Sequence, residues 1–383
     1  MKLKRIPLSS PHLGGGEQKY IQEAFDTNWV TSVGANIDAF ENELENYLGE
    51  GHVAALNSGT SAIHLALILL GVKKDDVVIC QSMTFAASAN HILYQGAIPV
   101  FVDSELDTWN ICPLALKEAI EDLLIQGKKP KAIIAVHLYG VPYKVDEVHA
   151  VANKYNIPVV EDAAEALGSR YKGKLCGLFG ECAVFSFNGS KIITTSSGGA
   201  IITKSKELKQ KAIYLATQAK EKTPYYQHME LGYNYRMSNI CAGIGRGQME
   251  VLEHHLRLRR EVNTFYQELF SNINGISVYA PPSFDYQPNY WLTTILVDTD
   301  LTMGITPETI RLALEKENIE SRPLWKPMHL QPVFEKYPFY GSNAAEKLYV
   351  EGLCLPSASN LSEEDKKRIK ENILVLFENS KQS

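Results

Sequence analysis

The chain has 383 residues, of which 45% are hydrophobic and 21% charged, and its formal net charge is −6. This length fits two domains, and the acidic balance argues against a nucleic-acid-binding protein, which would carry a basic excess. No stretch approaches the roughly 18 apolar residues of a membrane span, and the first residues lack a signal peptide's apolar run, so we expect a cytoplasmic protein without membrane contact.

Metal and redox chemistry have little support in the sequence. None of the six cysteines forms a C-x-x-C pair, so neither a zinc knuckle nor a redox pair is indicated. His254 and His255 are neighbours in a charge-rich helical stretch, where adjacent side chains point apart. We therefore expect no metal site.

The first two-thirds of the chain alternate between apolar strands and helices. We expect strands at 53–56, 77–80, 99–103, 132–136, 158–162, 183–187 and 200–203. We expect helices at 17–26, 40–48, 63–70, 85–94, 114–124, 145–154 and 206–215, and a long helical region with a break over 238–269. Repeated strand–helix units with nearly continuous apolar strands predict an α/β fold, with a mixed, mostly parallel sheet and helices on both faces.

A smaller α+β unit follows Pro281 and Pro282. It should contain strands at 290–297 and 352–355, helices at 307–317 and 362–378, and a loop at 322–329. We therefore predict a large α/β domain over residues 1–250, including an N-terminal arm, and a smaller α+β domain over residues 251–383.

Functional residue types follow several of the predicted strands directly. These are the segment 58–60, Phe85, the segment 137–140 and Asp162. Because ligands of such sheets sit at the carboxyl ends of the strands, we expect these residues to converge on one edge of the sheet.

Lys191 and Asp162 suggest a particular cofactor chemistry. Lys191 lies between the apolar run 183–187 and a loop of small hydroxylated residues, and Asp162 ends an apolar strand. A lysine amine that bonds to an aldehyde, and a carboxylate that keeps a pyridine nitrogen protonated, are what a pyridoxal phosphate enzyme needs. Taken singly, each has a plainer interpretation, a solvated lysine and a strand cap.

The segment 57–62 predicts a phosphate site. Gly59 permits a tight turn before an apolar helix, whose first N–H groups and positive dipole end attract anions. Thr60 and Ser61 would add hydroxyl donors. The alternative is a simple helix N-cap, for which serine and threonine are common.

Six segments of the chain together match a known motif pattern. They are 57–62, 84–85, 137–140, 161–165, 186–191 and 232–238. On these residues the chain resembles the sugar aminotransferases of the DegT/DnrJ/EryC1/StrS family, which are pyridoxal phosphate enzymes of fold type I (aspartate aminotransferase-like). The segments 10–15, 165–168 and 322–329 resemble most closely the 4-aminotransferases of UDP-2-acetamido-4-keto-2,4,6-trideoxyhexose, as in bacillosamine synthesis.

The resemblance implies roles for the cofactor-binding residues. Lys191 would be the covalent anchor for pyridoxal 5'-phosphate, Asp162 the partner of its ring nitrogen and Phe85 the aromatic ring stacked on it. Gly59, Thr60, Ser61 and Ser186 would contact the phosphate, together with Asn234 from a second subunit, which implies a homodimer with shared active sites.

Two positions depart from the usual family pattern. Glu165 stands where many members have glutamine beside the cofactor's ring hydroxyl, which changes the charge there. Asn188 stands where many have histidine, and because an amide cannot relay protons, Asn188 is expected to position the cofactor.

Substrate contacts are expected from two loops. Arg322, Trp325, Lys326 and His329 would meet the nucleotide diphosphate, and Asn28, Trp29, Val30 and Thr31 would close from the other side. The plainer alternatives are an ion pair for Arg322, a domain plug for Trp325 and a core plug for Trp29.

The implied activity is transfer of the amino group of L-glutamate to the 4-keto carbon of the UDP-linked sugar, with Lys191 as anchor and general base. One alternative is another nucleotide-linked 3- or 4-keto-deoxysugar, such as a dTDP sugar, and another is a non-catalytic regulatory protein with this fold. Related dehydratases carry histidine in place of the lysine, and a nicotinamide dehydrogenase would need a G-x-G-x-x-G motif, which the segment 57–62 lacks.

Overall fold

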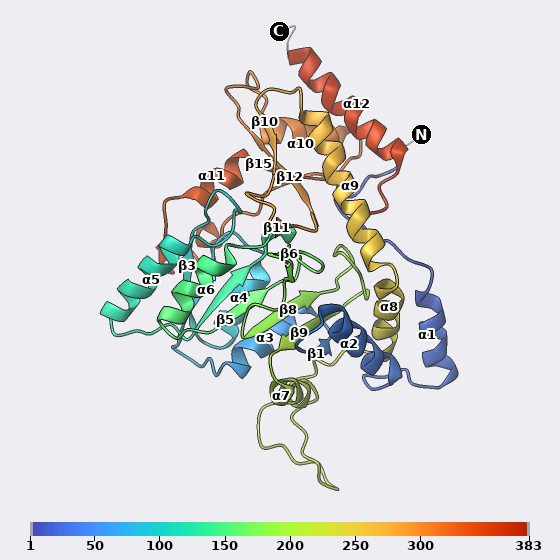
Figure 1. The fold of residues 1–383 in the computed structure, drawn as a ribbon, viewed down its shortest axis with the longest axis vertical. Coiled ribbons are helices and arrows are strands. Elements are labelled where there is room, and N and C mark those ends of the chain that lie inside the picture. Colours follow the sequence, from blue (N-terminus) through green and yellow to red (C-terminus); the bar gives the residue numbers. More distant parts are fainter. Residues whose placement is uncertain (1–2, 381–383) are drawn as a thin grey trace.

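The computed structural model describes residues 3–380 and is built around an eight-stranded sheet (Figure 1). Its strand order is β1-β9-β8-β5-β4-β2-β3-β14. The strands are β1 (His52–Leu56), β2 (Val77–Gln81), β3 (Ile98–Val102), β4 (Ala132–Val136), β5 (Val159–Asp162), β8 (Cys182–Ser186), β9 (Gly199–Thr203) and β14 (Phe339–Tyr340). Every neighbouring pair is parallel except the two made by β9, which runs antiparallel to β1 and to β8. The predicted mixed, mostly parallel sheet is therefore confirmed.

Helices cover both faces of this sheet because its strands are apolar on both sides. In β2, Val78 and Cys80 pack in one core cluster with residues of α3 and α4, whereas Val77 and Ile79 pack in another with residues of α5 and α6. The helices of this part are α1 (Glu17–Asp26), α2 (Ala35–Leu48), α3 (Gly59–Leu69), α4 (Ala86–Tyr94), α5 (Pro113–Ile125), α6 (Val145–Lys154), α7 (Lys206–Ala216), α8 (Asn239–Met249) and α9 (Leu252–Phe270). A short 3₁₀ helix, η1 (Leu138–Gly140), follows β4.

The expected elements are present, with shifted ends. Helix α2 begins at residue 35 rather than 40, directly after Gly34, which has a φ of 151°. The break in the long helical region falls between α8 and α9. The strand expected over 290–297 begins only at residue 293, because Tyr290 has a left-handed φ of 51° that interrupts an extended chain.

The C-terminal part contains a second, antiparallel sheet. Its strand order is β10 (Ile276–Val278), β12 (Thr293–Val297), β15 (Gly352–Leu355) and β13 (Arg322–Pro323). The helices α10 (Pro307–Lys316), α11 (Ala344–Glu351) and α12 (Glu363–Ser380) and the 3₁₀ helix η2 (Met328–Leu330) complete it. The short strands β10 and β13 and the helix α11 have no counterpart among the expected elements.

Several segments tie the two parts together. Strand β14, although late in the chain, pairs with β3 at the edge of the large sheet. Strand β11 (Tyr286–Gln287) pairs with β6 (Arg170–Tyr171), which also pairs with β7 (Lys174–Leu175). At the other end of the chain, Ile6 bridges to Ile319 and belongs to the core of the C-terminal part. The boundary at residue 250 remains a prediction, and Ile6 lies with the second unit.

The chain between α7 and α8 forms an arm that extends away from the body (Figure 1). Its two sides are joined by bridges at Thr217–Asn234 and Lys220–His228. The arm exposes large apolar side chains, namely Tyr225, Tyr226, Met229 and Leu231.

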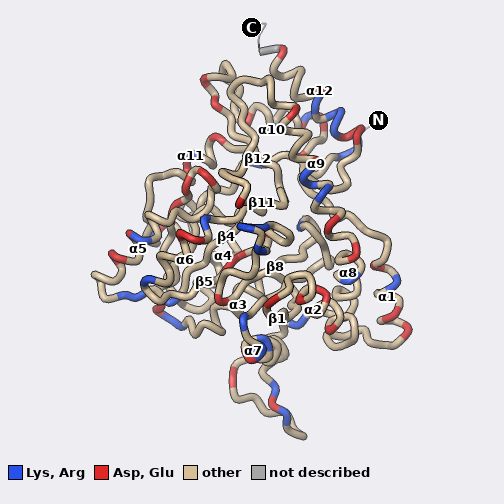
Figure 2. The backbone as a smooth tube through the Cα atoms, viewed as in Figure 1, with Lys and Arg blue, Asp and Glu red and all other residues tan. Residues whose placement is uncertain are grey.

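Charges of both signs are interspersed along the fold rather than gathered in one region (Figure 2). Among residues 3–380 we find no helix that is both long and apolar enough to cross a membrane.

Candidate active site

A cavity of about 530 Å³ opens at the carboxyl ends of the parallel strands. Val136, Asp162 and Ser186, which end β4, β5 and β8, form one wall, and Trp291 and Cys354 of the C-terminal part contribute another. The predicted site residues that line it are Gly59, Thr60, Phe85, Asp162, Glu165, Ser186, Asn188, Lys191, Arg322 and Trp325. The predicted convergence at one edge of the sheet is therefore present for the segment 58–60, Phe85 and Asp162, whereas the segment 137–140 does not line the cavity.

The Lys191 side chain ends between a carboxylate and an aromatic ring. Its Nζ lies 3.2 Å from Oε1 of Glu165 and 4.0 Å from the centre of the Trp291 ring. The other Glu165 oxygen accepts the Tyr139 backbone N–H at 2.8 Å. Burial raises the pKa of Glu165 to about 7, against the opposing effect of Lys191 and with a further upward effect of Asp162. Glu165 can therefore exchange a proton near neutral pH.

Hydrogen bonds hold the Asp162 carboxylate in place. Ser88 in the first turn of α4 donates to Oδ2 at 2.7 Å, and the backbone N–H of Ala164 donates to Oδ1 at 3.1 Å. The Thr84 hydroxyl lies 2.8 Å from that of Ser88. Sequence reasoning missed Ser88, although its spacing of four residues from Thr84 places the two on one side of a helix start.

The N-terminus of α3 forms a cradle beside Ser186. A Cβ added to Gly59 would lie 2.9 Å from the Cβ of Ser186, so glycine keeps this space open. Ser58 caps the helix by accepting the Ser61 N–H at 3.0 Å, and the Ser61 hydroxyl donates to Asn57 at 2.6 Å. Ser61 therefore belongs to the helix cap and does not line the cavity, while Thr60 is exposed there.

Two aromatic side chains, Phe85 and Trp325, form an aromatic wall of the cavity. Phe85 is 59% exposed, and its ring centre lies 5.6 Å from that of Trp325. Tyr139 lies 5.0 Å from the Trp325 ring, and its hydroxyl accepts the Trp325 backbone N–H at 2.9 Å. Trp325 is thus fixed in the wall of the cavity.

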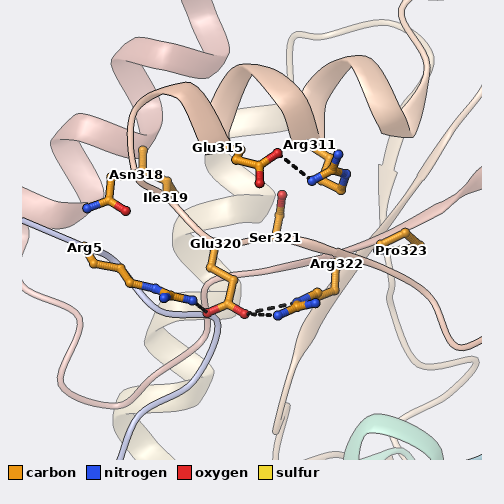
Figure 3. Close-up of a pocket in the computed structure, with 9 residues that line it drawn as sticks. All are labelled: Arg5, Arg311, Glu315, Asn318, Ile319, Glu320, Ser321, Arg322 and Pro323. Carbon is orange, nitrogen blue, oxygen red and sulfur yellow. Dashed lines mark hydrogen bonds and ion pairs between the residues drawn. The ribbon is translucent and has the colours of Figure 1, made fainter. Parts of the chain in front are cut away.

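Arg322 lines the main cavity and also a neighbouring one of about 390 Å³ (Figure 3). Its guanidinium is 2.7 Å from one oxygen of Glu320, whose other oxygen is 2.9 Å from Arg5 (Figure 3). Arg322 therefore makes the ion pair that the plainer interpretation expected. Arg322 nevertheless also lines the main cavity.

The other predicted substrate residues lie outside the cavity of their own chain. His329 packs against Phe339 with ring centres 3.7 Å apart, and its ring nitrogens meet Ser82 and Glu346. Lys326 is exposed and absent from the lining.

The segment 28–31 and Asn234 also lie away from this cavity. Residues 28–31 are exposed and attach to the start of α8, where Asn239 donates to the Trp29 carbonyl at 2.9 Å. Trp29 is 50% exposed, so it does not plug the core. The exposed Asn234 accepts a hydrogen bond from Asn57 through its backbone oxygen.

The residues present fit pyridoxal phosphate. Lys191 offers an amine for its aldehyde, the fixed Asp162 carboxylate offers a partner for a protonated ring nitrogen, and the Gly59–Ser186 cradle at a helix N-terminus suits a phosphate. With the sheet order, these groups define a pyridoxal phosphate-dependent transferase of fold type I.

The chain belongs to the DegT/DnrJ/EryC1/StrS aminotransferase family, whose family model matches residues 11–374. It is 48% identical over 378 residues to the "Putative pyridoxal phosphate-dependent aminotransferase EpsN" of Bacillus subtilis (strain 168), covering 98% of this chain and 96% of that protein. It is 38% identical to the GDP-perosamine synthase of Escherichia coli O157:H7, covering 94% and 96%. The structure of Helicobacter pylori PseC, an aminotransferase involved in the biosynthesis of pseudoaminic acid, matches with a TM-score of 0.89 at 27% identity, covering 98% of this chain and all of that one. The protein is therefore a pyridoxal phosphate-dependent nucleotide-sugar aminotransferase.

Proposed function

We propose that the enzyme moves the amino group of L-glutamate to the 4-keto carbon of a UDP-linked 2-acetamido-4-keto-2,4,6-trideoxyhexose, as a cytoplasmic homodimer. The observation that carries the chemistry is the contact between Lys191 and Glu165 in a cavity that also holds Asp162. When bound, pyridoxal phosphate accepts electrons from the reacting carbon and carries the amino group between the two substrates.

The side chains of the cavity divide the remaining work. Lys191 anchors the cofactor and moves the substrate proton as a general base. Asp162, oriented by Ser88, holds the ring nitrogen, and Phe85 covers the ring. Thr60 and Ser186 bind the phosphate, and Asn188 positions the cofactor from the loop that carries Lys191.

For the sugar substrate, the aromatic wall and Arg322 are the supporting features. Trp325 offers an apolar face, and apolar faces suit a deoxygenated sugar ring. Arg322 supplies a cation next to the cavity, as a diphosphate requires. A different nucleotide base is the main alternative, because one relative is named a GDP-perosamine synthase.

Three features support a dimer with shared active sites. Phe85 is largely exposed although it lines the cavity, the arm between α7 and α8 displays apolar side chains, and Asn234 lies outside the cavity of its own chain. Packing of two arms against each other's subunit would cover these surfaces and bring Asn234 and the segment 28–31 to a second cavity.

An absorbance spectrum of the cofactor-loaded protein, before and after glutamate, is the first test. We expect a visible band that glutamate converts to a near-ultraviolet band, and we expect the UDP-linked 4-keto-sugar to restore the first band. The same keto-sugar linked to GDP or dTDP serves as the matched comparison, with mass spectrometry of the amino-sugar product.

Restoration by a GDP- or dTDP-linked sugar alone would move the proposal to that substrate. A protein that binds the cofactor but ignores glutamate would need another amino donor. Absence of any bound cofactor would contradict the proposed chemistry altogether.

A further inference from the structure

The indole ring of Trp291 lies against the end of the Lys191 side chain. The Lys191 Nζ lies 4.0 Å from the centre of this ring, and Trp291 is only 6% exposed. A desolvated aromatic face attracts an ammonium group. The amine therefore has two partners, the Trp291 ring and the Glu165 carboxylate.

The same tryptophan also holds the backbone just before Lys191. Its indole N–H donates to the carbonyl of Ser190 at 2.7 Å. The Ser9 hydroxyl donates to this carbonyl at 2.7 Å as well. The Trp291 side chain thus contacts both the backbone just before Lys191 and the amine at the end of the Lys191 side chain.

Arg259 on α9 completes the clamp, which we define as Trp291 and Arg259 together. Its guanidinium donates to the carbonyl of Trp291 at 2.6 Å and to the carbonyl of Lys191 at 3.3 Å. It also donates to the Ser357 carbonyl at 3.0 Å and to the Ser9 hydroxyl at 3.1 Å. Arg259 therefore bonds to the main chain of both residues that meet at the amine.

The cost of burying Arg259 indicates that its role exceeds packing. The residue is 1% exposed, and within residues 3–380 no carboxylate lies at ion-pair distance from it. Burial lowers the pKa of Arg259 to about 9, which still leaves it charged at neutral pH. Burying a cation without a carboxylate partner costs free energy. An apolar side chain would fill the same space without that cost.

The clamp joins three separate parts of the chain. Lys191 follows β8 of the large sheet, Trp291 precedes β12 of the second sheet, and Arg259 lies in the helix between them in sequence. The Trp291 backbone is fixed from both sides, since its N–H donates to Asn289 at 2.8 Å and its carbonyl accepts from Arg259. A movement of the second sheet would therefore shift Trp291 and, with it, the ring face on which the Lys191 amine lies.

We propose that Trp291 and Arg259 are positioning residues for Lys191, which hold its amine on the indole face whenever it is not bonded to the cofactor. This proposal rests on Lys191 being the covalent anchor of the proposed function. Its consequence is that the amine stays within reach of the cavity, so the bond to the cofactor re-forms quickly and the substrate proton is moved along one fixed path.

Four variants separate the contributions of the clamp. Trp291→Phe keeps an aromatic face and loses the N–H, and Trp291→Leu loses both. Arg259→Lys keeps the charge and loses the forked donor, and Arg259→Met removes the charge. Trp109→Leu is the matched control, because Trp109 is equally buried at 6% exposure but packs against Tyr279 outside the cavity.

The main readout is the rate at which the visible band appears when pyridoxal phosphate is added to cofactor-free protein. Loss of one hydrogen bond should slow Trp291→Phe by roughly 3- to 10-fold, and loss of the aromatic face as well should slow Trp291→Leu by a further roughly 3- to 30-fold. Arg259→Lys should retain more of the rate than Arg259→Met. The rate of the glutamate half-reaction should fall in the same order, with the KM for glutamate changed less than about twofold, and Trp109→Leu should lower thermal stability alone.

Several results would overturn the proposal. One is a Trp291→Leu band that forms within twofold of the wild-type rate, and another is an equal slowing in Trp109→Leu. If Trp291→Leu or Arg259→Met does not fold, Trp291→Phe and Arg259→Lys decide, and unchanged rates in both would count against the clamp. A wild-type protein that forms no band would overturn the proposed function and the clamp together, whereas a normal wild-type band with unaffected variants would overturn the clamp alone.

Discussion

Lys191 is the residue whose removal should have the largest effect. Lys191→Ala should abolish the visible band and lower turnover by at least about 10²- to 10⁴-fold, from loss of acid–base catalysis alone. Lys209→Ala is a suitable control, because the side chains of Lys209 and Lys191 are similarly buried, at 17% and 15% exposure, and Lys209 pairs with Glu41 outside the cavity. Near-wild-type amino transfer by the Lys191 variant, measured by product mass, would be incompatible with the assigned role.

Glu165 should make stability depend on pH near neutrality. Its pKa in the folded protein is raised to about 7 from 4.5, so the folded state binds this proton more tightly than the unfolded state. The stabilisation is complete below pH 4.5 and is lost as the pH rises through 7. Glu165→Gln removes this dependence. As the pH rises from 5 to 8.5, the free energy of unfolding of the wild type should therefore fall by about 2 kcal/mol relative to that of the variant.

Urea unfolding of the cofactor-free proteins at these two pH values measures this difference. Glu45→Gln is the control, because hydrogen bonds from Val53 and Lys209 outweigh burial and lower the pKa of Glu45. Its contribution is lost only below pH 4.5, and the control should therefore follow the wild type between pH 5 and pH 8.5. Parallel behaviour of the wild type and Glu165→Gln would show that Glu165 does not titrate in this range.

At the scale of the elements, the start of helix α3 is the proposed binding site for the cofactor's phosphate. Gly59→Ala would place a Cβ 2.9 Å from that of Ser186, closer than real side chains approach, so the cradle must widen or fill. We expect the affinity for pyridoxal phosphate to fall by about tenfold or more, which corresponds to about 1.4 kcal/mol. Thermal stability should change less than the affinity does, because alanine favours the helix over glycine by up to about 1 kcal/mol and this offsets part of the crowding.

Gly189→Ala is the matched control for this substitution. It makes the same change in the loop before Lys191, where the nearest atom to the added Cβ would be Pro11 Cγ at 3.6 Å. Fluorescence titration of both variants with the cofactor gives the comparison. Equal affinities for the two would show that the cradle does not hold the phosphate.

The arm between α7 and α8 is the feature that bears on the whole molecule. Tyr226 and Leu231 are 81% and 79% exposed in the single chain, and contact with a second subunit would bury them. The double variant Tyr226→Glu and Leu231→Glu should halve the mass in solution and weaken cofactor binding, because Asn234 would lose its site. Phe284→Glu, at a residue 99% exposed outside the arm, should keep the wild-type mass. Sedimentation velocity measures both, and an unchanged mass of the arm variant would contradict the proposed interface.

The order of elements and much of the candidate site can be predicted from the sequence. Apolar runs of strand length, and the glycine, aromatic and carboxylate residues directly after them, are local signals that can be recognised along the chain. For this reason Gly59, Phe85 and Asp162 are correctly predicted to share one edge of the sheet. The antiparallel direction of β9 and the late insertion of β14 beside β3 are not accessible in this way, because strand pairing depends on contacts between distant segments.

Local sequence by itself determined which residues we predict to carry the cofactor chemistry, since each stands in a short motif at or just after a strand end. Only the tertiary structure decided what surrounds the amine. Trp291 and Arg259 are far from Lys191 in sequence and meet it through carbonyl hydrogen bonds and a ring face. Such contacts can be made to the main chain of any residue, so they leave no spacing pattern along the chain, and they exist only once the two sheets have packed together.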